Sequence, residues 1–412
     1  MQARRAMRLR AARLWPAAAL RRSRSDLAVP RAPRAARGAA GVPRRGSEFQ
    51  ALPVLDYRDM EGNSSQFVSD LRDACSTVGF FVLAGLPAQT VQLHGDVLRI
   101  ARAFFALPPE EKGRIEYCHS PQFRGYMSLG VENTAGRRDE REQIEFGREE
   151  PVPSLLADAP LFERLRGPNQ WPEAPHEFRT IVGRWLQEME ALSWSVTRAL
   201  SASMGLETHA LDSLFKTPHI QAKLVHYPGA AGALDSSSAA DTGSLGVGAH
   251  SDSGFLTLLL QDDVGGLEVL NSAGQWVAAT PIPGSLVCNL GEVLQLLSGG
   301  VFLSTVHRVQ RPRPGSGGRL SAPFFWNPSL DVVVRPLTGS SAPAGCEPES
   351  TASLSGRPAQ ESNRLIPSYG MNAFKSLARS HPHVFARHHA DLQVLPDGQV
   401  VWRREVRAAC AE

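Results

Sequence analysis

Apolar side chains recur at helical spacing in three segments of the first half of the chain, residues 64–78, 88–106 and 177–204. A serine that can cap a helix stands at the start of the first segment, and Gly79 and Gly205 follow the first and the last. Because one face of each segment is apolar, we expect three amphipathic helices that pack against a core. The longest is expected to lie along the outside of that core.

Short runs of strand-forming residues dominate the second half. Residues 80–83 form an early apolar run, and from Ala222 onward such runs recur, for example at residues 255–261. Two of them flank Asn271–Gly274, which favours a hairpin turn. A short helix is expected at residues 373–378. The pattern therefore predicts a mainly β fold with flanking helices.

Two segments rich in small and polar residues are expected to be loops. Residues 229–248 are Gly/Ala/Ser-rich and end just before His250 and Asp252, which are candidate site residues. This loop is therefore placed to act as a lid over them. Residues 337–360 are polar and contain proline, serine and glycine.

The main chemical signal is the set of His250, Asp252 and His307. Side chains at i and i+2 of a strand point to one face, so His250 and Asp252 converge if their segment is extended. His307 follows His250 by 57 residues and is expected on another strand that faces the first, as in a barrel of two packed sheets. Two imidazoles and one carboxylate can occupy one face of an iron octahedron and leave the other open. We therefore expect a non-haem Fe(II) site.

Arg319 and Ser321 follow the second histidine and again share one face of a strand. A guanidinium group pairs with a carboxylate through two hydrogen bonds, and a nearby hydroxyl adds a donor. The pair is therefore expected to bind a small dicarboxylate beside the metal.

Each of these motifs alone is weak, because His-x-Asp and Arg-x-Ser arise by chance and a single histidine is more often a core or surface residue. Their order along the chain is what favours a metal site. The four histidines near the C-terminus have no acidic or cysteine partner at a useful spacing, so we expect no metal there; they are His381, His383, His388 and His389.

Further segments between Leu52 and Leu395 add to the evidence from the metal motif. They are Leu52–Asp56, Ala74–Val82, Phe104–Lys112, Phe123–Tyr126, Gly167–Pro172, Val225–Pro228 and Gly291–Gln295. With the metal motif, they make the chain resemble the isopenicillin-N-synthase-like branch of the Fe(II)- and 2-oxoglutarate-dependent oxygenases. The resemblance implies a double-stranded β-helix core, which is a jelly roll of the cupin type.

The resemblance also implies roles for the site residues. The two histidines and the aspartate of the metal motif would ligate Fe(II), while Arg319 and Ser321 would hold the distal carboxylate of 2-oxoglutarate and Tyr227 would contact the same cosubstrate. The family often has asparagine two residues before that tyrosine, whereas this chain has Val225.

The activity implied is oxidation of a small organic metabolite, most often hydroxylation, with dioxygen as oxidant and succinate and CO2 as coproducts. Ascorbate would serve as reductant in vitro. Two alternatives stay open: an oxidase of the same fold that does not consume 2-oxoglutarate, as in isopenicillin N synthase and ACC oxidase, and a non-catalytic barrel that acts as a binding module.

Substrate contacts are expected near the mouth of the barrel. The side chains considered are Phe123, Arg124, Tyr126 and Phe325, together with the 229–248 loop and the C-terminal segment. Ordinary packing is the alternative for each of them. The sequence indicates neither the substrate nor the oligomeric state.

The N-terminal segment differs from the rest in charge. Residues 1–45 hold 13 arginines, no lysine and one acid, Asp26, and so carry about +12; because the whole chain carries +3, residues 46–412 carry about −9. An Arg-rich, acid-poor start is typical of a transit peptide for a mitochondrion or plastid. If it is a disordered extension or a misassigned start instead, the cytoplasm is expected. The acidic body disfavours nucleic-acid binding.

Cysteine usage and hydropathy fit an enzyme of a reducing compartment. The cysteines are scattered and odd in number, with no Cys-x-x-Cys pair, which argues against a disulfide framework or a structural zinc site; they are Cys75, Cys118, Cys288, Cys346 and Cys410. No apolar run is long enough to span a bilayer.

Four regions are expected along the chain. They are a leader (1–48), an N-terminal α/β region (49–205), the jelly-roll core (206–335) and a C-terminal loop and helix (336–412).

Overall fold

The computed structural model describes residues 48–62, 64–134, 137–156, 158–229, 245–313, 315, 317–337 and 366–403. The expected leader up to residue 47, residues 230–244 of the expected first loop and residues 338–360 of the second lie outside this part. All the described residues belong to one compact unit.

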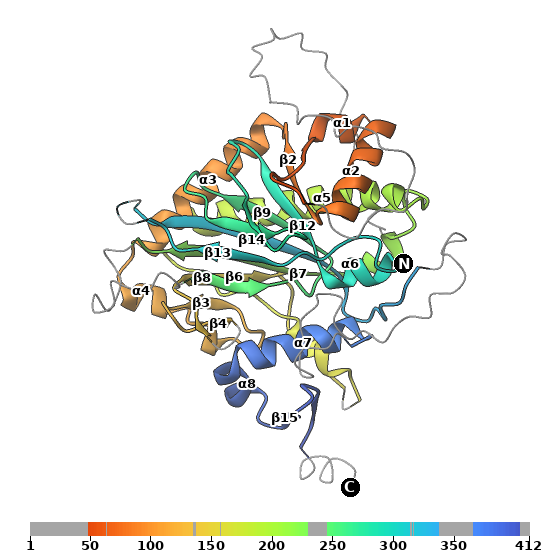
Figure 1. The fold of residues 1–412 in the computed structure, drawn as a ribbon. Helices are drawn as coiled ribbons and strands as arrows, with labels where there is room; N and C mark the ends of the chain where they lie inside the picture. Colours follow the sequence, from red (N-terminus) through yellow and green to blue (C-terminus); the bar gives the residue numbers. More distant parts are fainter. Residues whose placement is uncertain are drawn as a thin grey trace, which may run out of the picture. The chain divides into compact units, whose positions relative to one another are not determined.

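The larger of two main sheets has eight strands (Figure 1). In sheet order they are β1 (Val54–Asp56), β2 (Phe80–Ala84), β12 (Leu286–Leu290), β9 (Leu256–Gln261), β14 (Arg319–Ser329), β7 (Pro218–Tyr227), β6 (Glu142–Gly147) and β3 (Gly125–Met127). The pair β1–β2 is parallel and the other neighbours are antiparallel. The expected N-terminal region and the expected jelly-roll core therefore share one sheet.

The smaller sheet has four antiparallel strands. In order they are β11 (Trp276–Ala278), β10 (Leu267–Leu270), β13 (His307–Gln310) and β8 (Leu245–His250). The predicted hairpin is confirmed as β10–β11, and the Asn271 side chain accepts hydrogen bonds from the backbone N–H groups of Ala273 and Gln275 in its turn. The last residues of the expected 229–248 loop belong to β8 rather than to a loop.

The two sheets face each other across an apolar interior. This interior takes Phe80, Val225 and Val287 from the large sheet and Val247 and Val309 from the small one. Two antiparallel sheets packed in this way form the double-stranded β-helix that the resemblance implied.

Alternate residues of β14 separate the two environments of the large sheet, as strand geometry requires. Phe324 and Trp326 are fully buried in the main core on the helical side. Arg319, Ser321 and Phe325 line a cavity on the side that faces the small sheet. The period of two therefore places packing residues on one face and chemical groups on the other.

Three helices pack on the outer face of the large sheet and confirm the predicted amphipathic segments. They are α2 (Ser65–Thr77), α3 (Ala88–Phe105) and α5 (Phe178–Ser203). Ser64 caps α2, and Trp326 of β14 donates a hydrogen bond to the Thr197 hydroxyl of α5 at 3.0 Å. Figure 1 shows α3 and α5 on one side of the sheet and α7 (Tyr369–Ser380) on the other.

The remaining elements are short. They are α1 (Tyr57–Glu61), α4 (Pro109–Gly113), α6 (Glu292–Leu297), α8 (Pro382–His388), η1 (Tyr117–His119), η2 (Leu161–Leu165), η3 (Asp212–Phe215) and the two-stranded pairs β4 (Asn133–Thr134) with β5 (Arg137–Arg138) and β15 (Leu392–Val394) with β16 (Val400–Trp402). The predicted short helix at 373–378 is the centre of the longer α7. In the described part of the chain, no helix combines the length and apolarity needed to cross a bilayer.

We expect Trp326→Ala to lower the free energy of unfolding by about 3–5 kcal/mol, because it leaves a large cavity between β14 and α5. Chemical denaturation measures the loss. Trp276→Ala is the matched control, since that ring lies on the edge strand β11 under the Arg308 guanidinium and should cost clearly less. Equal losses would contradict the assignment of the core.

Candidate metal centre and cosubstrate site

His250 and His307 lie side by side on neighbouring strands of the small sheet. His250 ends β8, His307 begins β13, and the two are register partners with ring centroids 4.3 Å apart. The expectation that His307 comes from a strand facing His250 across the barrel is therefore wrong. A direct antiparallel pair is what brings two residues so distant in sequence into contact.

Asp252 completes the group from the loop that leads from β8 to the large sheet. Its Oδ1 lies 3.7 Å from Nε2 of His250 and 3.8 Å from Nε2 of His307. Its Oδ2 accepts hydrogen bonds from Thr257 at 2.6 Å and from Asn289 at 2.7 Å. One carboxylate oxygen is thus held by the large sheet, while the other is directed at the two imidazoles.

Backbone carbonyl groups orient both imidazoles. Nδ1 of His250 lies 2.8 Å from the carbonyl oxygen of Gly248, and Nδ1 of His307 lies 3.1 Å from that of Thr305. Because a carbonyl can only accept, each Nδ1 carries the proton and each Nε2 keeps its lone pair. This is the tautomer that binds a metal through Nε2.

The start of α6 supports the loop that carries Asp252. The segment around Gly291 therefore has a structural role beside the metal group. The N–H groups of Glu292 and Val293 donate to the carbonyl oxygens of Asp252 and Gly254 at 2.8 and 3.0 Å. A Cβ atom at Gly291 would collide with the carbonyl oxygen of Gly254 and lie 2.9 Å from that of Asp252. Glycine is required here because the two backbones approach so closely.

The electrostatics of the group favour a bound cation. Burial and the neighbouring His250 lower the pKa of His307 below its ordinary value, so this imidazole is neutral near pH 7. Although burial acts to raise the pKa of Asp252, the two imidazoles and the hydrogen bonds from Thr257 and Asn289 lower it overall. A neutral imidazole and an ionised carboxylate are ready ligands, since neither has to lose a proton to bind a metal.

Arg319 is a buried guanidinium group, only 1% exposed, whose hydrogen-bond partners among the described residues are neutral. Its Nη1 donates to the Ser321 hydroxyl at 3.1 Å and its Nη2 to the side-chain oxygen of Gln261 at 3.3 Å, whereas its Nε has no hydrogen-bond acceptor in the described part. A buried charge with only neutral partners is costly. The site therefore fits an anion with two oxygens.

Tyr227 and Val225 lie beside this guanidinium on β7. Arg319 is the register partner of Tyr227, and Ser321 that of Val225. The Arg319 guanidinium lies over the Tyr227 ring at 4.9 Å, and a Cβ atom at Gly246 would come within 2.8 Å of the same ring. Tyr227 is thus fixed between the cation and the small sheet, and Val225 makes the wall apolar where the family often has asparagine.

One cavity of about 380 Å³ joins these groups. Its lining includes every metal and cosubstrate residue expected from the sequence, and one of the expected substrate residues: His250, Asp252, His307, Arg319, Ser321, Tyr227 and Phe325. The buried guanidinium and the three ligands therefore open onto the same space.

The other three expected substrate residues do not line this cavity, so the structure gives them packing roles instead. Phe123 is buried at a positive φ of 63° and stacks on His389. The buried Arg124 donates to several backbone carbonyl groups. The Tyr126 hydroxyl donates to Glu142 at 2.6 Å on the opposite face of the sheet. Their shared motif leads into β3 at the edge of the large sheet, and its side chains are used for packing.

Comparison with known proteins identifies the family. The model of the non-haem dioxygenase N-terminal region in morphine synthesis matches residues 52–174, and that of the 2OG-Fe(II) oxygenase superfamily matches residues 220–328. A homoarginine-6-hydroxylase of Arabidopsis thaliana is 34% identical over 304 residues, which cover 71% of this chain and 89% of that protein. The chain belongs to the 2OG-Fe(II) oxygenase superfamily.

Other relatives agree with this membership. A 2-oxoglutarate-dependent dioxygenase of Dothideomycetidae sp. is 36% identical and covers 70% of this chain and 77% of its own. A crystal structure of a Neurospora crassa enzyme with alpha-ketoglutarate, another name for 2-oxoglutarate, and thymine is 27% identical, with a TM-score of 0.60 over 72% of this chain and 92% of that one. The expected class, an Fe(II)- and 2-oxoglutarate-dependent dioxygenase, is confirmed. The oxidase and binding-module alternatives find no support in these names.

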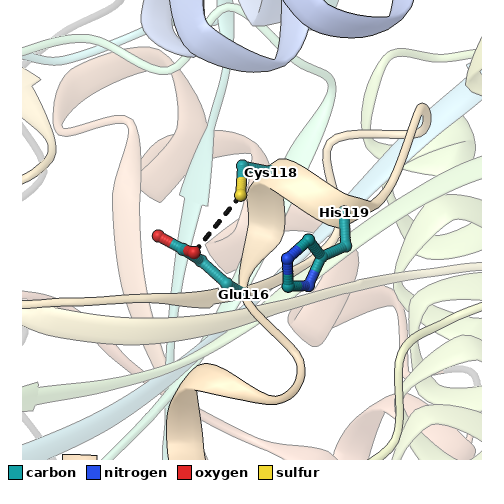
Figure 2. Close-up of side chains that lie close together, drawn as sticks. All are labelled: Glu116, Cys118 and His119. Atoms are coloured by element: carbon teal, nitrogen blue, oxygen red, sulfur yellow. Dashed lines mark hydrogen bonds between the residues drawn. The ribbon is translucent and has the colours of Figure 1, made fainter. Parts of the chain in front are cut away.

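The oxygenase has a second group of possible ligands on its surface, at η1 (Figure 2). Ligand atoms of Glu116, Cys118 and His119 lie within 4.8 Å of one another. The Cys118 thiol donates to Glu116, and burial and this bond raise its pKa, so the thiol keeps its proton. The Arg387 guanidinium lies 3.7 Å from the sulfur. A protonated thiol beside a guanidinium is a poor cation site, and we assign no metal to it.

One charged part of the cavity wall is not predicted by the sequence pattern. These residues are Glu132, Arg141, Glu145, Lys223 and His381. Glu145 and Lys223 occupy cavity-facing positions of β6 and β7, which the period of two would have shown had both strands been assigned.

Of the other C-terminal histidines, His388 and His389 each lie 2.9 Å through Nε2 from a backbone carbonyl oxygen.

We expect Thr257→Val to weaken Fe(II) binding by about tenfold or more, because it frees the Asp252 carboxylate to rotate. Anaerobic equilibrium dialysis measures the affinity. Thr197→Val is the matched control, since it removes a buried hydroxyl on the other face of the sheet. Unchanged affinity in Thr257→Val would show that this hydrogen bond does not position the ligand.

Proposed function

We propose that this oxygenase hydroxylates a small polar metabolite, with His250, Asp252 and His307 as the iron ligands and Arg319 as the main contact of the distal carboxylate of 2-oxoglutarate. The observation that carries the proposal is the buried Arg319 guanidinium, which has only neutral hydrogen-bond partners among the described residues and opens onto the same cavity as the three ligands. A site that held only a metal ion would not need a buried guanidinium group beside it.

The residues of the metal group fit Fe(II). Two nitrogens and one carboxylate oxygen form the donor set of the facial triad, and the two Nε2 atoms lie 3.7 and 3.8 Å from Oδ1 of Asp252. When bound, Fe(II) supplies the activation of dioxygen that couples loss of CO2 from 2-oxoglutarate to oxidation of a C–H bond. One atom of dioxygen enters succinate, and the other enters the hydroxylated metabolite.

The side chains of this protein then have three tasks. Arg319 and Ser321 orient 2-oxoglutarate by its far carboxylate, and the Tyr227 ring closes one side of that position. The apolar side chains around the site, among them Val225 and Phe325, exclude water from it. Fixed orientation and exclusion of water are what a protein contributes to such cofactor chemistry.

The nature of the cavity supports a small substrate. A volume of about 380 Å³ suits a metabolite rather than a polymer, and relatives named above act on or bind small molecules, homoarginine in one case and thymine in another. The charged wall residues favour a polar compound over a hydrocarbon.

Removal of the metal tests the assignment of the ligands. We expect a chelator to abolish formation of succinate from 2-oxoglutarate by the full chain, and added Fe(II) with ascorbate to restore it. His307→Ala should not be restored and should bind Fe(II) at least 100-fold more weakly, because one of three ligands is lost. His209→Ala, at an exposed surface position, is the control. Full activity of His307→Ala would disprove the triad.

The cosubstrate role of Arg319 needs a separate test. Arg319→Met should raise the KM for 2-oxoglutarate by about 100-fold, as expected for loss of one partner of a buried charged pair, with little change in Fe(II) affinity. Arg308→Met is the matched control, because that arginine pairs with Glu268 away from the cavity. If Arg319→Met keeps the normal KM, the cation serves another anion.

A further inference from the structure

The cavity has a charged wall made by five side chains that the roles above do not use. Nζ of Lys223 lies 2.8 Å from Glu145 and 3.4 Å from Glu132, and Glu132 lies 2.7 Å from the Arg141 guanidinium. Nε2 of His381 lies 3.6 Å from Glu145. The signs alternate from Arg141 through Glu132 and Lys223 to Glu145, and all five side chains line the cavity.

The wall belongs to the same sheet face as the cosubstrate residues. Glu145 and Lys223 are register partners on β6 and β7, and Lys223 precedes Tyr227 by four residues on β7. Four residues of extended strand span roughly 13 Å. The wall is therefore separated from the expected position of 2-oxoglutarate by about the length of a small molecule, with the apolar Val225 between them.

Burial makes these charges expensive. None of the four side chains Glu132, Arg141, Lys223 and Glu145 is more than 15% exposed. Their attraction keeps them ionised, since the neighbouring cations hold the pKa of Glu145 low against burial and the neighbouring acids hold that of Lys223 high. Buried ion pairs are often no more stabilising than apolar side chains of the same size, so stability alone does not explain them.

A second buried ion pair on the other face of the same sheet shows the contrast. Lys112 donates to Glu142 and to a backbone carbonyl, and Glu142 also accepts from Tyr126 and lies 2.8 Å from His226. These groups satisfy one another and do not line the cavity. In the wall, by contrast, Nε of Arg141 has no hydrogen-bond partner among the described residues.

We propose that the wall binds the ammonium and carboxylate groups of a free amino acid, whose side chain extends past Val225 and Phe325 toward the iron ligands. Glu145 and Glu132 accept from the ammonium group, and the Arg141 guanidinium donates to the carboxylate. The inference rests on the proposed function, because it names the substrate class of that same site.

The alternation of charge favours an amino acid over an ion of one sign. Any group bound against the wall lies near both a carboxylate and a cation, because neighbouring members are within 4 Å. A lone carboxylate or a lone ammonium group would gain one attraction and suffer one repulsion. A zwitterion can satisfy both signs at once, whereas a neutral ring would leave the charges desolvated and unpaired.

The first test is a comparison of ligands with the unmodified full chain, loaded anaerobically with Fe(II) and 2-oxoglutarate. Isothermal calorimetry would measure binding of L-norleucine and L-homoarginine, and of thymine, hexanoate and pentylamine. The last two keep the alkyl chain of norleucine but lack one charged group. We expect at least one of the two amino acids to bind tenfold more tightly than hexanoate, pentylamine and thymine. Equal or tighter binding of any of those three, or no binding of either amino acid, would overturn the inference.

Variants then assign the effect to the wall. Glu145→Gln should weaken binding of the preferred amino acid at least tenfold but weaken hexanoate, which lacks the ammonium group, much less. Glu142→Gln is the matched control, because it removes a buried carboxylate of the same strand on the opposite face. If Glu145→Gln weakens both ligands equally, its role is structural and the inference fails.

A separate titration of the Fe(II)-loaded chain with 2-oxoglutarate, before any amino acid is added, distinguishes this inference from the proposed function. If the unmodified chain binds no 2-oxoglutarate, the proposed function fails. If it binds 2-oxoglutarate but shows no preference for the amino acids, only the assignment of the wall fails.

Discussion

The hydrogen bonds from Thr257 and Asn289 to the Asp252 carboxylate are the constraint on which the site depends. These two donors are register partners on β9 and β12 of the large sheet, whereas His250 and His307 are register partners on the small sheet. Asp252 lies in the loop between the sheets, so its two oxygens connect them. The metal group therefore forms only when both sheets are in place, and the packing of the whole barrel sets its geometry.

The two faces of the large sheet have different roles: one packs in the core, and the other carries the polar groups of the cavity. Its outer face, with Trp326 and Phe324, packs against α3 and α5 and is closed to water. Its inner face presents Arg319 beside the metal group and Lys223 farther along. Since side chains alternate along each strand, a single hydrogen-bonded register fixes both sets at once. The chain can thus hold buried charges in a cavity while the opposite face supplies apolar burial.

Much of this arrangement could be predicted from the sequence, because the proposed metal and cosubstrate residues recur at a spacing that strands impose, and the structure brings them to one cavity. The pairing of β8 with β13 could not, since periodicity gives the face of a strand but not its neighbour. The charged wall was missed because no strand was predicted around Glu145, and its neighbour His381 is distant in sequence. Phe123 was wrongly expected to contact the substrate, because its backbone adopts a positive φ and its side chain is buried in the core.

The central claim is that the metal group and the Arg319 guanidinium form one site. The most direct measurement is the affinity for 2-oxoglutarate of the full chain with and without Fe(II), by anaerobic calorimetry. We predict clearly tighter binding in the presence of Fe(II) and, by thermodynamic reciprocity, tighter Fe(II) binding in the presence of 2-oxoglutarate. Asp252→Ala should remove this coupling. An affinity for 2-oxoglutarate that does not depend on the metal would contradict the claim.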